Sequence, residues 1–286
     1  MRMAIEHRLQ KKYPGLWSLL NKNAQKNLPY GINEYLNKKN YKRKSWQALQ
    51  IPENYINDLI NFCGVKIVGD TYRPDLSAVH SESSFLDILH EIVLCASLAR
   101  IGRNIKLRPR AGERTRCDVL FQVEGIDVFG EVKHWVDNWS IDPGKPKSRL
   151  LFKSSANEIN QNHSKPRSME LYGKLMDATR QFPAGNVNIL FVFAPSIGDS
   201  LTYLQQALWG DFNFFKKSDK IVLENDGLFA TPEGNIISAC YLSHIDFLDF
   251  GKLVFTKAGN NPNATVPLPA SVENFLKKYD AANLNQ

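Results

Sequence analysis

Residues 116–135, RCDVLFQVEGIDVFGEVKHW, decide the fold. Apolar and polar residues alternate on both sides of Glu124-Gly125, as in two half-buried strands joined by a tight turn. A two-residue turn pairs Val123 with Ile126 and, further along the hairpin, Asp118 with Glu131. We therefore predict a β-hairpin in which two carboxylates lie directly opposite each other.

The alternation also predicts what each face of the hairpin does. Side chains along a strand point to opposite faces in turn, so Asp118, Glu131 and Lys133 share one face. Phe129 and Trp135 belong to that face too, and the opposite face carries Val119, Phe121, Val123, Val128 and Val132. We expect the valine-rich face to form core and the charged face to carry the chemistry.

Two opposed carboxylates need a cation between or beside them. Like charges directly opposite each other cost about 0.2–1 kcal/mol even when exposed, and more when buried. Lys133 could supply the cation as a structural ion pair. Mg²⁺ is the alternative, because it binds one or two carboxylates and completes its shell with water and substrate phosphate. Both interpretations fit the residues.

The elements around the hairpin predict an α/β domain. A helix with an apolar stripe begins at a capping box, Ser84 to Asp87, and stops at Gly102. A short strand (104–108) precedes the hairpin, and a helix (168–182) and a buried, parallel strand (187–193) follow it. The region 81–193 thus reads as one helix, three strands, one helix and one strand.

The flanking regions predict a two-part organisation. Residues 1–75 read as a basic region of short helices, including one over 51–64, and 71–77 reads as a connector into a second domain, 76–286. That domain has its core in 81–193 and an extension in 194–286. The extension is expected to hold a helix at 201–208, short strands at 220–223 and 236–242, and an amphipathic helix at 271–279.

The hairpin and its surroundings resemble the PD-(D/E)xK nuclease superfamily. Asp118 is followed, after twelve residues, by Glu131-Val132-Lys133, the one Glu-x-Lys of the sequence, within the helix, strand and helix order of 81–193. Cys117 stands where the motif has proline. The resemblance implies a restriction-endonuclease-like αβββαβ core, a mixed sheet flanked by helices, behind the basic helical N-terminal region.

The resemblance also implies roles for individual residues. Asp118 and Glu131 would bind Mg²⁺, or Mn²⁺ in its place, and Lys133 would activate the attacking water and stabilise the phosphate. The backbone carbonyl of Val132 would be a third ligand. Glu91 would be the acid that many members take from the preceding helix; it lies at the edge of that helix's apolar stripe, so partial exposure is the alternative. Gln181 resembles a polar residue of some members, or is an ordinary surface glutamine.

Basic residues gather in three segments and predict a polyanionic partner. Residues 1–50 hold eleven lysines and arginines against two glutamates, and the other two segments lie around 100–116 and 145–167. Each segment alone could be solvated surface; beside an acidic centre they suggest contacts to a phosphate backbone. The candidate nucleic-acid-binding residues are Lys42, Arg43, Lys44, Arg108, Arg110, Arg114, Arg116, Lys145 and Lys147.

Composition excludes several other classes. The four cysteines form no CxxC pair, and no P-loop, GxGxxG or HExxH motif occurs, which leaves nucleotide-dependent and zinc enzymes without support. No segment approaches about 20 apolar residues and the N-terminus has no apolar leader. We expect a cytoplasmic protein without a membrane partner.

Taken together, the residues predict a Mg²⁺-dependent endonuclease that hydrolyses phosphodiester bonds of DNA rather than RNA, in restriction, repair or mobile-element processing. Cutting both strands would favour a homodimer. The alternative is a non-catalytic nucleic-acid-binding protein that keeps the nuclease fold.

Overall fold

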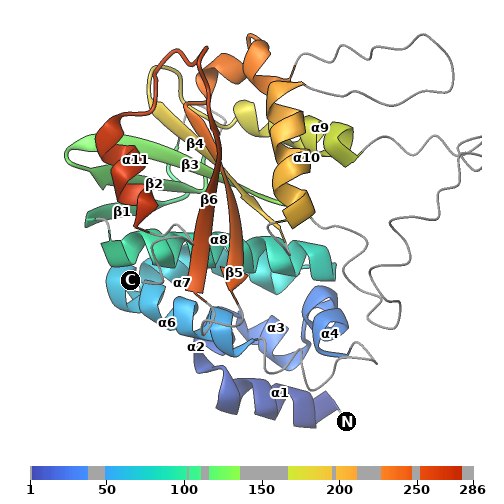
Figure 1. The fold of residues 1–286 in the computed structure, drawn as a ribbon. Helices are drawn as coiled ribbons and strands as arrows, with labels where there is room; N and C mark the ends of the chain where they lie inside the picture. The colour runs from blue at the N-terminus through green and yellow to red at the C-terminus, as the bar shows by residue number, and fades with distance from the viewer. Residues whose placement is uncertain are drawn as a thin grey trace, which may run out of the picture.

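A six-stranded mixed β-sheet lies between two layers of helices (Figure 1). The computed structural model describes residues 2–37, 49–101, 103–110, 116–135, 167–194, 198–210, 227–246 and 252–278. The strands follow one another across the sheet in chain order. β3 to β5 are parallel neighbours, and the pairs β1/β2, β2/β3 and β5/β6 are antiparallel. Their bounds are β1 Arg103–Leu107, β2 Val119–Val123, β3 Ile126–His134, β4 Val187–Phe193, β5 Ala239–Asp246 and β6 Lys252–Asn260.

The predicted hairpin is confirmed with its register. Val123 pairs with Ile126 and Val119 with Gly130, so the next position along places Asp118 against Glu131. The turn residues Glu124 and Gly125 both have positive φ, 51° and 83°, which is the geometry of the type I′ turn that matches the twist of a hairpin. The tight turn therefore fixes which residues of the two strands meet.

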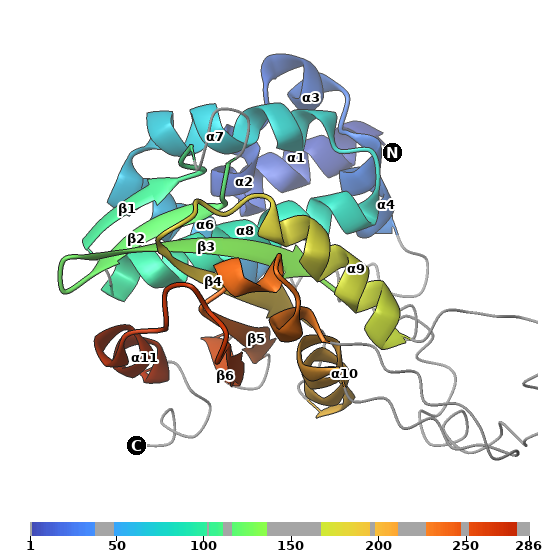
Figure 2. The same ribbon diagram turned by 90° about the horizontal axis from the view of Figure 1, so that it is seen from above.

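One face of the sheet packs on α8 (Glu82–Ile101) and, beyond it, on the N-terminal helices (Figures 1 and 2). One hydrophobic cluster joins residues from Leu9 in α1 to Leu276 in α11, so the N-terminal region and the sheet share a core. A boundary at residue 75 falls inside α7. These helices are α1 Arg2–Lys12, α2 Pro14–Ser18, α3 Lys22–Lys26, α4 Tyr30–Asn37, α6 Gln50–Cys63 and α7 Val65–Ala78.

The connector predicted for 71–77 is wrong, because those residues belong to α7 with Pro74 inside the helix. Tyr72 and Leu76, on either side of Pro74, are fully buried. Their burial offsets the hydrogen bond that the proline removes. The helix expected over 51–64 is confirmed as α6, which ends where Gly64 takes a positive φ of 86°.

The start predicted for α8 is three residues late. Its first turn is capped by Ser81, whose Oγ accepts a hydrogen bond from the Ser84 amide at 3.1 Å. Glu34 of α4 accepts the Glu82 amide at 2.9 Å. A local serine and a carboxylate from another helix therefore cap α8 together, three residues before the predicted capping box.

The opposite face of the sheet packs on α9 (Arg167–Thr179) and α10 (Gly198–Trp209) in a second hydrophobic cluster (Figure 2). β4 is buried throughout and runs parallel to both neighbours, as predicted. Phe129 and Trp135 contact this second cluster. The valine-rich face forms core, as predicted. The expectation that the other face is only a charged surface is wrong, because helices cover that face too and Phe129 and Trp135 pack there.

The C-terminal region completes the sheet. It supplies β5, β6 and two short 3₁₀ turns (Leu228–Ala230 and Gly234–Ile236), and α11 (Ala270–Lys277) packs on β2 through Phe275 and Phe121, whose ring centroids are 6.0 Å apart. The helices expected near 201–208 and 271–279 are confirmed. β6 was not predicted, the strand expected at 236–242 lies slightly later as β5, and 220–223 lies outside the described residues. No helix in the described ranges has the length and apolar character needed to cross a membrane.

Candidate active site

A pocket of about 370 Å³ opens where the three layers meet. Glu91 of α8, Asp118 before β2 and Glu131 of β3 line it together with Lys133 and Arg108. Gln181 and Lys174, from the α9 side, complete the wall. The structure therefore gathers the four candidate catalytic residues of the sequence into one cavity, although they come from three elements of the chain.

Asp118 is held by backbone groups on both sides. Its Oδ2 accepts a hydrogen bond from the Val132 amide at 2.7 Å, and its own carbonyl accepts one from the Arg108 amide at 2.8 Å. The first contact follows from the pairing of β2 with β3, and the second continues the pairing of β1 with β2 by one residue beyond Leu107 and Val119. Val132 also lines the pocket, and the role predicted for its carbonyl stays a prediction.

Glu131 is almost fully buried, with 1% of its surface exposed. Its Oε1 accepts a hydrogen bond from Lys133 Nζ at 2.6 Å. The other oxygen, Oε2, has no hydrogen-bond partner among the described residues, although the nearby Asp118 amide lowers the pKa of the carboxyl group. Oε1 of Glu131 therefore has a hydrogen-bond donor and Oε2 has none among the described residues; we call Oε2 the vacant oxygen. A buried carboxylate oxygen without a donor costs free energy unless a cation or water binds it.

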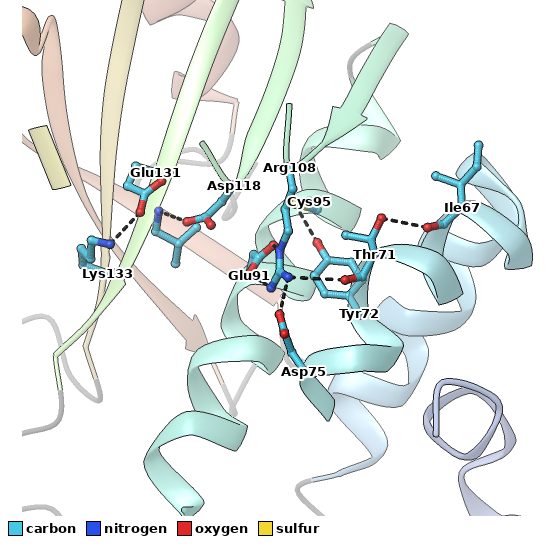
Figure 3. A network of polar contacts seen from close by, with 11 residues as sticks. Ile67, Thr71, Tyr72, Asp75, Glu91, Cys95, Arg108, Asp118, Glu131 and Lys133 are labelled. Carbon is cyan, nitrogen blue, oxygen red and sulfur yellow. Dashed lines mark hydrogen bonds and ion pairs between the residues drawn. The ribbon is translucent and has the colours of Figure 1, made fainter. Parts of the chain in front are cut away.

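Glu91 is also buried, at 6% exposure, so the inward-facing interpretation is confirmed. Its partner is Arg108, whose Nε donates to Oε1 and whose Nη2 donates to Oε2, each at 2.8 Å. This is the two-pronged geometry that makes arginine–carboxylate pairs strong. Figure 3 shows this ion pair beside Asp118 and Glu131. Both oxygens of Glu91 are therefore satisfied within the protein.

The three carboxyl groups disfavour one another's ionisation. Burial and, next to it, the charge of Glu131 raise the pKa of Asp118 to about 7, while the hydrogen bond from the Val132 amide acts in the opposite direction. Burial likewise raises the pKa of Glu131 to about 7, opposed by Lys133, and that of Glu91 to about 7, opposed by Arg108. Burial lowers the pKa of Lys133, but the Glu131 carboxylate more than offsets this and the net shift is upward. Such a cluster has an unmet demand for positive charge.

The donor set fits a hard divalent cation. Asp118 and Glu131 offer carboxylate oxygens, including the vacant Oε2, and Mg²⁺ needs only one or two carboxylates beside water and phosphate. Among the described residues no group of three or more His, Cys, Asp or Glu side chains is arranged to hold a metal ion. Because Glu91 is paired with Arg108, the carboxylates that remain for a cation are those of Asp118 and Glu131.

The basic residues predicted to contact nucleic acid are distributed unevenly. Arg110 and Arg116 form a bridge between antiparallel segments and are both exposed, close in sequence to Asp118. Arg108 is drawn into the protein by its ion pairs, so it serves the pocket rather than the surface. Lys42, Arg43, Lys44, Arg114, Lys145 and Lys147 lie outside the described residues.

Gln181 lies on the pocket wall, and the residue that replaces the motif's proline fixes its position. Cys117 is buried and its thiol donates to the Gln181 carbonyl at 2.9 Å. This bond ties the turn after α9 to the residue before Asp118. The departure at Cys117 therefore has a structural role in joining two walls of the pocket.

The sequence analysis missed three residues of the pocket. His134 follows Lys133, and its Nδ1 lies 2.8 Å from Asp87 Oδ1. Lys174 extends from α9 to within 3.4 Å of the His134 carbonyl. Asp87 could have been found, because it precedes Glu91 by four residues and so lies on the same helix face. Nothing local in the sequence marks Lys174.

Comparisons with known proteins add no relative. No protein-family model, no curated protein and no solved structure matches this chain.

Proposed function

We propose that this protein is a divalent-metal-dependent endonuclease that hydrolyses phosphodiester bonds in DNA, with Mg²⁺ as the cofactor and Mn²⁺ as a substitute. The observation that carries the proposal is the vacant, buried Oε2 of Glu131, in a pocket shared with Asp118 and Lys133. Two carboxylates and a lysine at one cavity are the groups that phosphodiester hydrolysis requires.

The fold supports the same proposal. α8, β1, β2, β3, α9 and β4 follow one another in the αβββαβ order, with β1 to β3 antiparallel and β4 parallel to β3. We infer a restriction-endonuclease-like core over this region. In it Asp118 lies directly before β2, and Glu131 lies in the second half of β3, where that strand pairs with β4.

Asp118 and Glu131 would hold the cation, which supplies Lewis-acid stabilisation of the phosphate and lowers the pKa of bound water. Lys133 is held within 2.6 Å of Glu131, so its ammonium lies beside the same carboxylate. From there it can orient the attacking water and stabilise negative charge that develops on the phosphate. The Val132 amide keeps Asp118 in place for this.

Substrate would reach the pocket past basic residues of the rim. Exposed Arg110 and Arg116 are suited to phosphates that flank the scissile bond. Lys174, exposed on α9, provides a cation on the other side. These contacts read the backbone rather than base edges, so they support DNA binding without assigning a target sequence.

The test is cleavage of supercoiled plasmid by the wild type, by Asp118→Asn and by Asp127→Asn, with Mg²⁺ or with EDTA. Asp127 is an exposed aspartate of β3, in the same hairpin as Asp118, so its variant is a matched control and should cut like the wild type. Asp118→Asn should not cut, and EDTA should stop all cleavage. Binding of plasmid without cleavage by all three proteins in Mg²⁺ and Mn²⁺ would refute the enzyme and favour a non-catalytic nucleic-acid-binding protein.

A further inference from the structure

Arg108 lines the acidic pocket, and its guanidinium is bound by residues of two helices, α7 and α8. Its guanidinium binds both oxygens of Glu91, Asp75 of α7, and the Thr71 carbonyl at 3.4 Å. It lies 5.0 Å from the centre of the buried Tyr72 ring. Figure 3 shows these contacts converging from α7 and α8 on one side chain. Arg108 is thus fixed from several directions.

The backbone of Arg108 is strained at the same place. Its φ is 44°, in the left-handed region that non-glycine residues rarely adopt. Its amide donates to the Asp118 carbonyl at 2.8 Å. Strain of this kind persists only where the surrounding contacts hold it. One residue therefore links the main chain of Asp118 to the side chain of Glu91.

We propose that Arg108 is a positioning residue that withholds Glu91 from the metal, so that Asp118 and Glu131 alone supply carboxylates to the cation. This inference rests on the proposed function and specifies its ligand set. Two observations carry it: both Glu91 oxygens are occupied by Arg108 at 2.8 Å, whereas Oε2 of Glu131 is vacant.

The proposal makes a prediction about metal affinity that a purely structural ion pair does not. Without the guanidinium, Glu91 becomes a third carboxylate on the same pocket, and cation affinity rises with the number of charged ligands. Arg108→Met should therefore bind Mg²⁺ more tightly than the wild type, by at least about tenfold. The double variant Arg108→Met/Glu91→Met has neither charge and should lose that gain.

The experiment titrates Mg²⁺ into each purified full-length protein by calorimetry and records the rise in melting temperature with Mg²⁺ as a second readout. Asp70→Asn is the control, because it removes an exposed ion pair of α7, Lys66–Asp70 at 2.7 Å. It should leave affinity unchanged. If circular dichroism shows Arg108→Met to be unfolded without metal, Arg108→Lys replaces it; a lysine cannot bind both Glu91 oxygens in parallel and frees one of them.

Each result decides the matter. A gain in Arg108→Met, or in Arg108→Lys where that variant stands in, that disappears in the double variant supports the proposal. Affinity that is unchanged or lower in that single variant, or a gain that persists in the double variant, overturns the proposal. A double variant that binds Mg²⁺ more than about tenfold more weakly than the wild type also overturns it, and makes Glu91 a direct ligand. If the wild type itself shows no Mg²⁺ binding while folded, the proposed metal-dependent function fails, and this inference fails with it.

Discussion

Two buried glutamates line the same pocket and are satisfied in different ways. Glu91 on α8 has both oxygens bound by one arginine, whereas Glu131 on β3 has one oxygen bound by Lys133 and the other vacant. Their burial is similar, at 6% and 1% exposure. This difference is what the proposed function requires, with a structural ion pair at Glu91 and a cation ligand at Glu131. Burial alone therefore does not distinguish the two acids, whereas their hydrogen bonds do.

The largest effect that we predict is on catalysis at Glu131. Glu131→Gln keeps the size of the side chain but removes the charge that binds the cation, so cleavage should fall by roughly 1000-fold, about 4 kcal/mol of transition-state stabilisation. Single-turnover cleavage of plasmid at saturating Mg²⁺ measures it. A fall of less than about tenfold would contradict a catalytic role for Glu131.

The second prediction concerns the stability of the satisfied pair. Glu91→Gln leaves the Arg108 guanidinium without its main partner in a mostly buried site, so we expect a loss of roughly 3 kcal/mol in unfolding free energy. Urea denaturation in EDTA provides the measurement, with Asp70→Asn as the control for an exposed pair. A loss equal to that of the control would remove the contrast between the two glutamates.

The third prediction is a pH dependence that a cation should reverse. Carboxyl groups whose pKa is raised on folding keep a proton that the unfolded chain has lost, so stability falls as pH rises from about 4.5 to 7. Burial raises the pKa of Asp118, Glu131 and Glu91 to about 7 each. In EDTA the unfolding free energy should fall over this window, because each pKa unit gained on folding corresponds to about 1.4 kcal/mol. Mg²⁺ should restore more stability at pH 8 than at pH 5; equal effects would contradict the site.

The smallest effect should be a gain in stability at the vacant oxygen. Glu131→Gln removes a buried charge that only one lysine offsets, so in EDTA at pH 8 the variant should be more stable than the wild type by about 1 kcal/mol. The same substitution at Glu91 should have the opposite sign. Urea denaturation of both variants in one buffer checks this. A loss at both positions would show that Glu131, too, is mainly structural.

Much of the fold followed from local patterns. The Glu124-Gly125 turn, the register it sets and the fully apolar run of β4 could all be read from the sequence, because turn chemistry and two-residue periodicity act on neighbouring residues. The start of α8 could not, since Glu34 on a distant helix helps to cap it. Residues 71–77 could not either, since burial of Tyr72 and Leu76 outweighs the proline.

The sequence by itself determined the spacing of Asp118, Glu131 and Lys133, because one hairpin carries all three and its alternation places them. Only the tertiary structure decided the partners of Glu91 and Arg108, which are seventeen residues apart on different elements. In the sequence, Arg108 cannot be told from a surface cation. In the folded protein, packing removes it from water and places it beside a buried acid. Long-range ion pairs depend on where helices pack, and no local pattern encodes that.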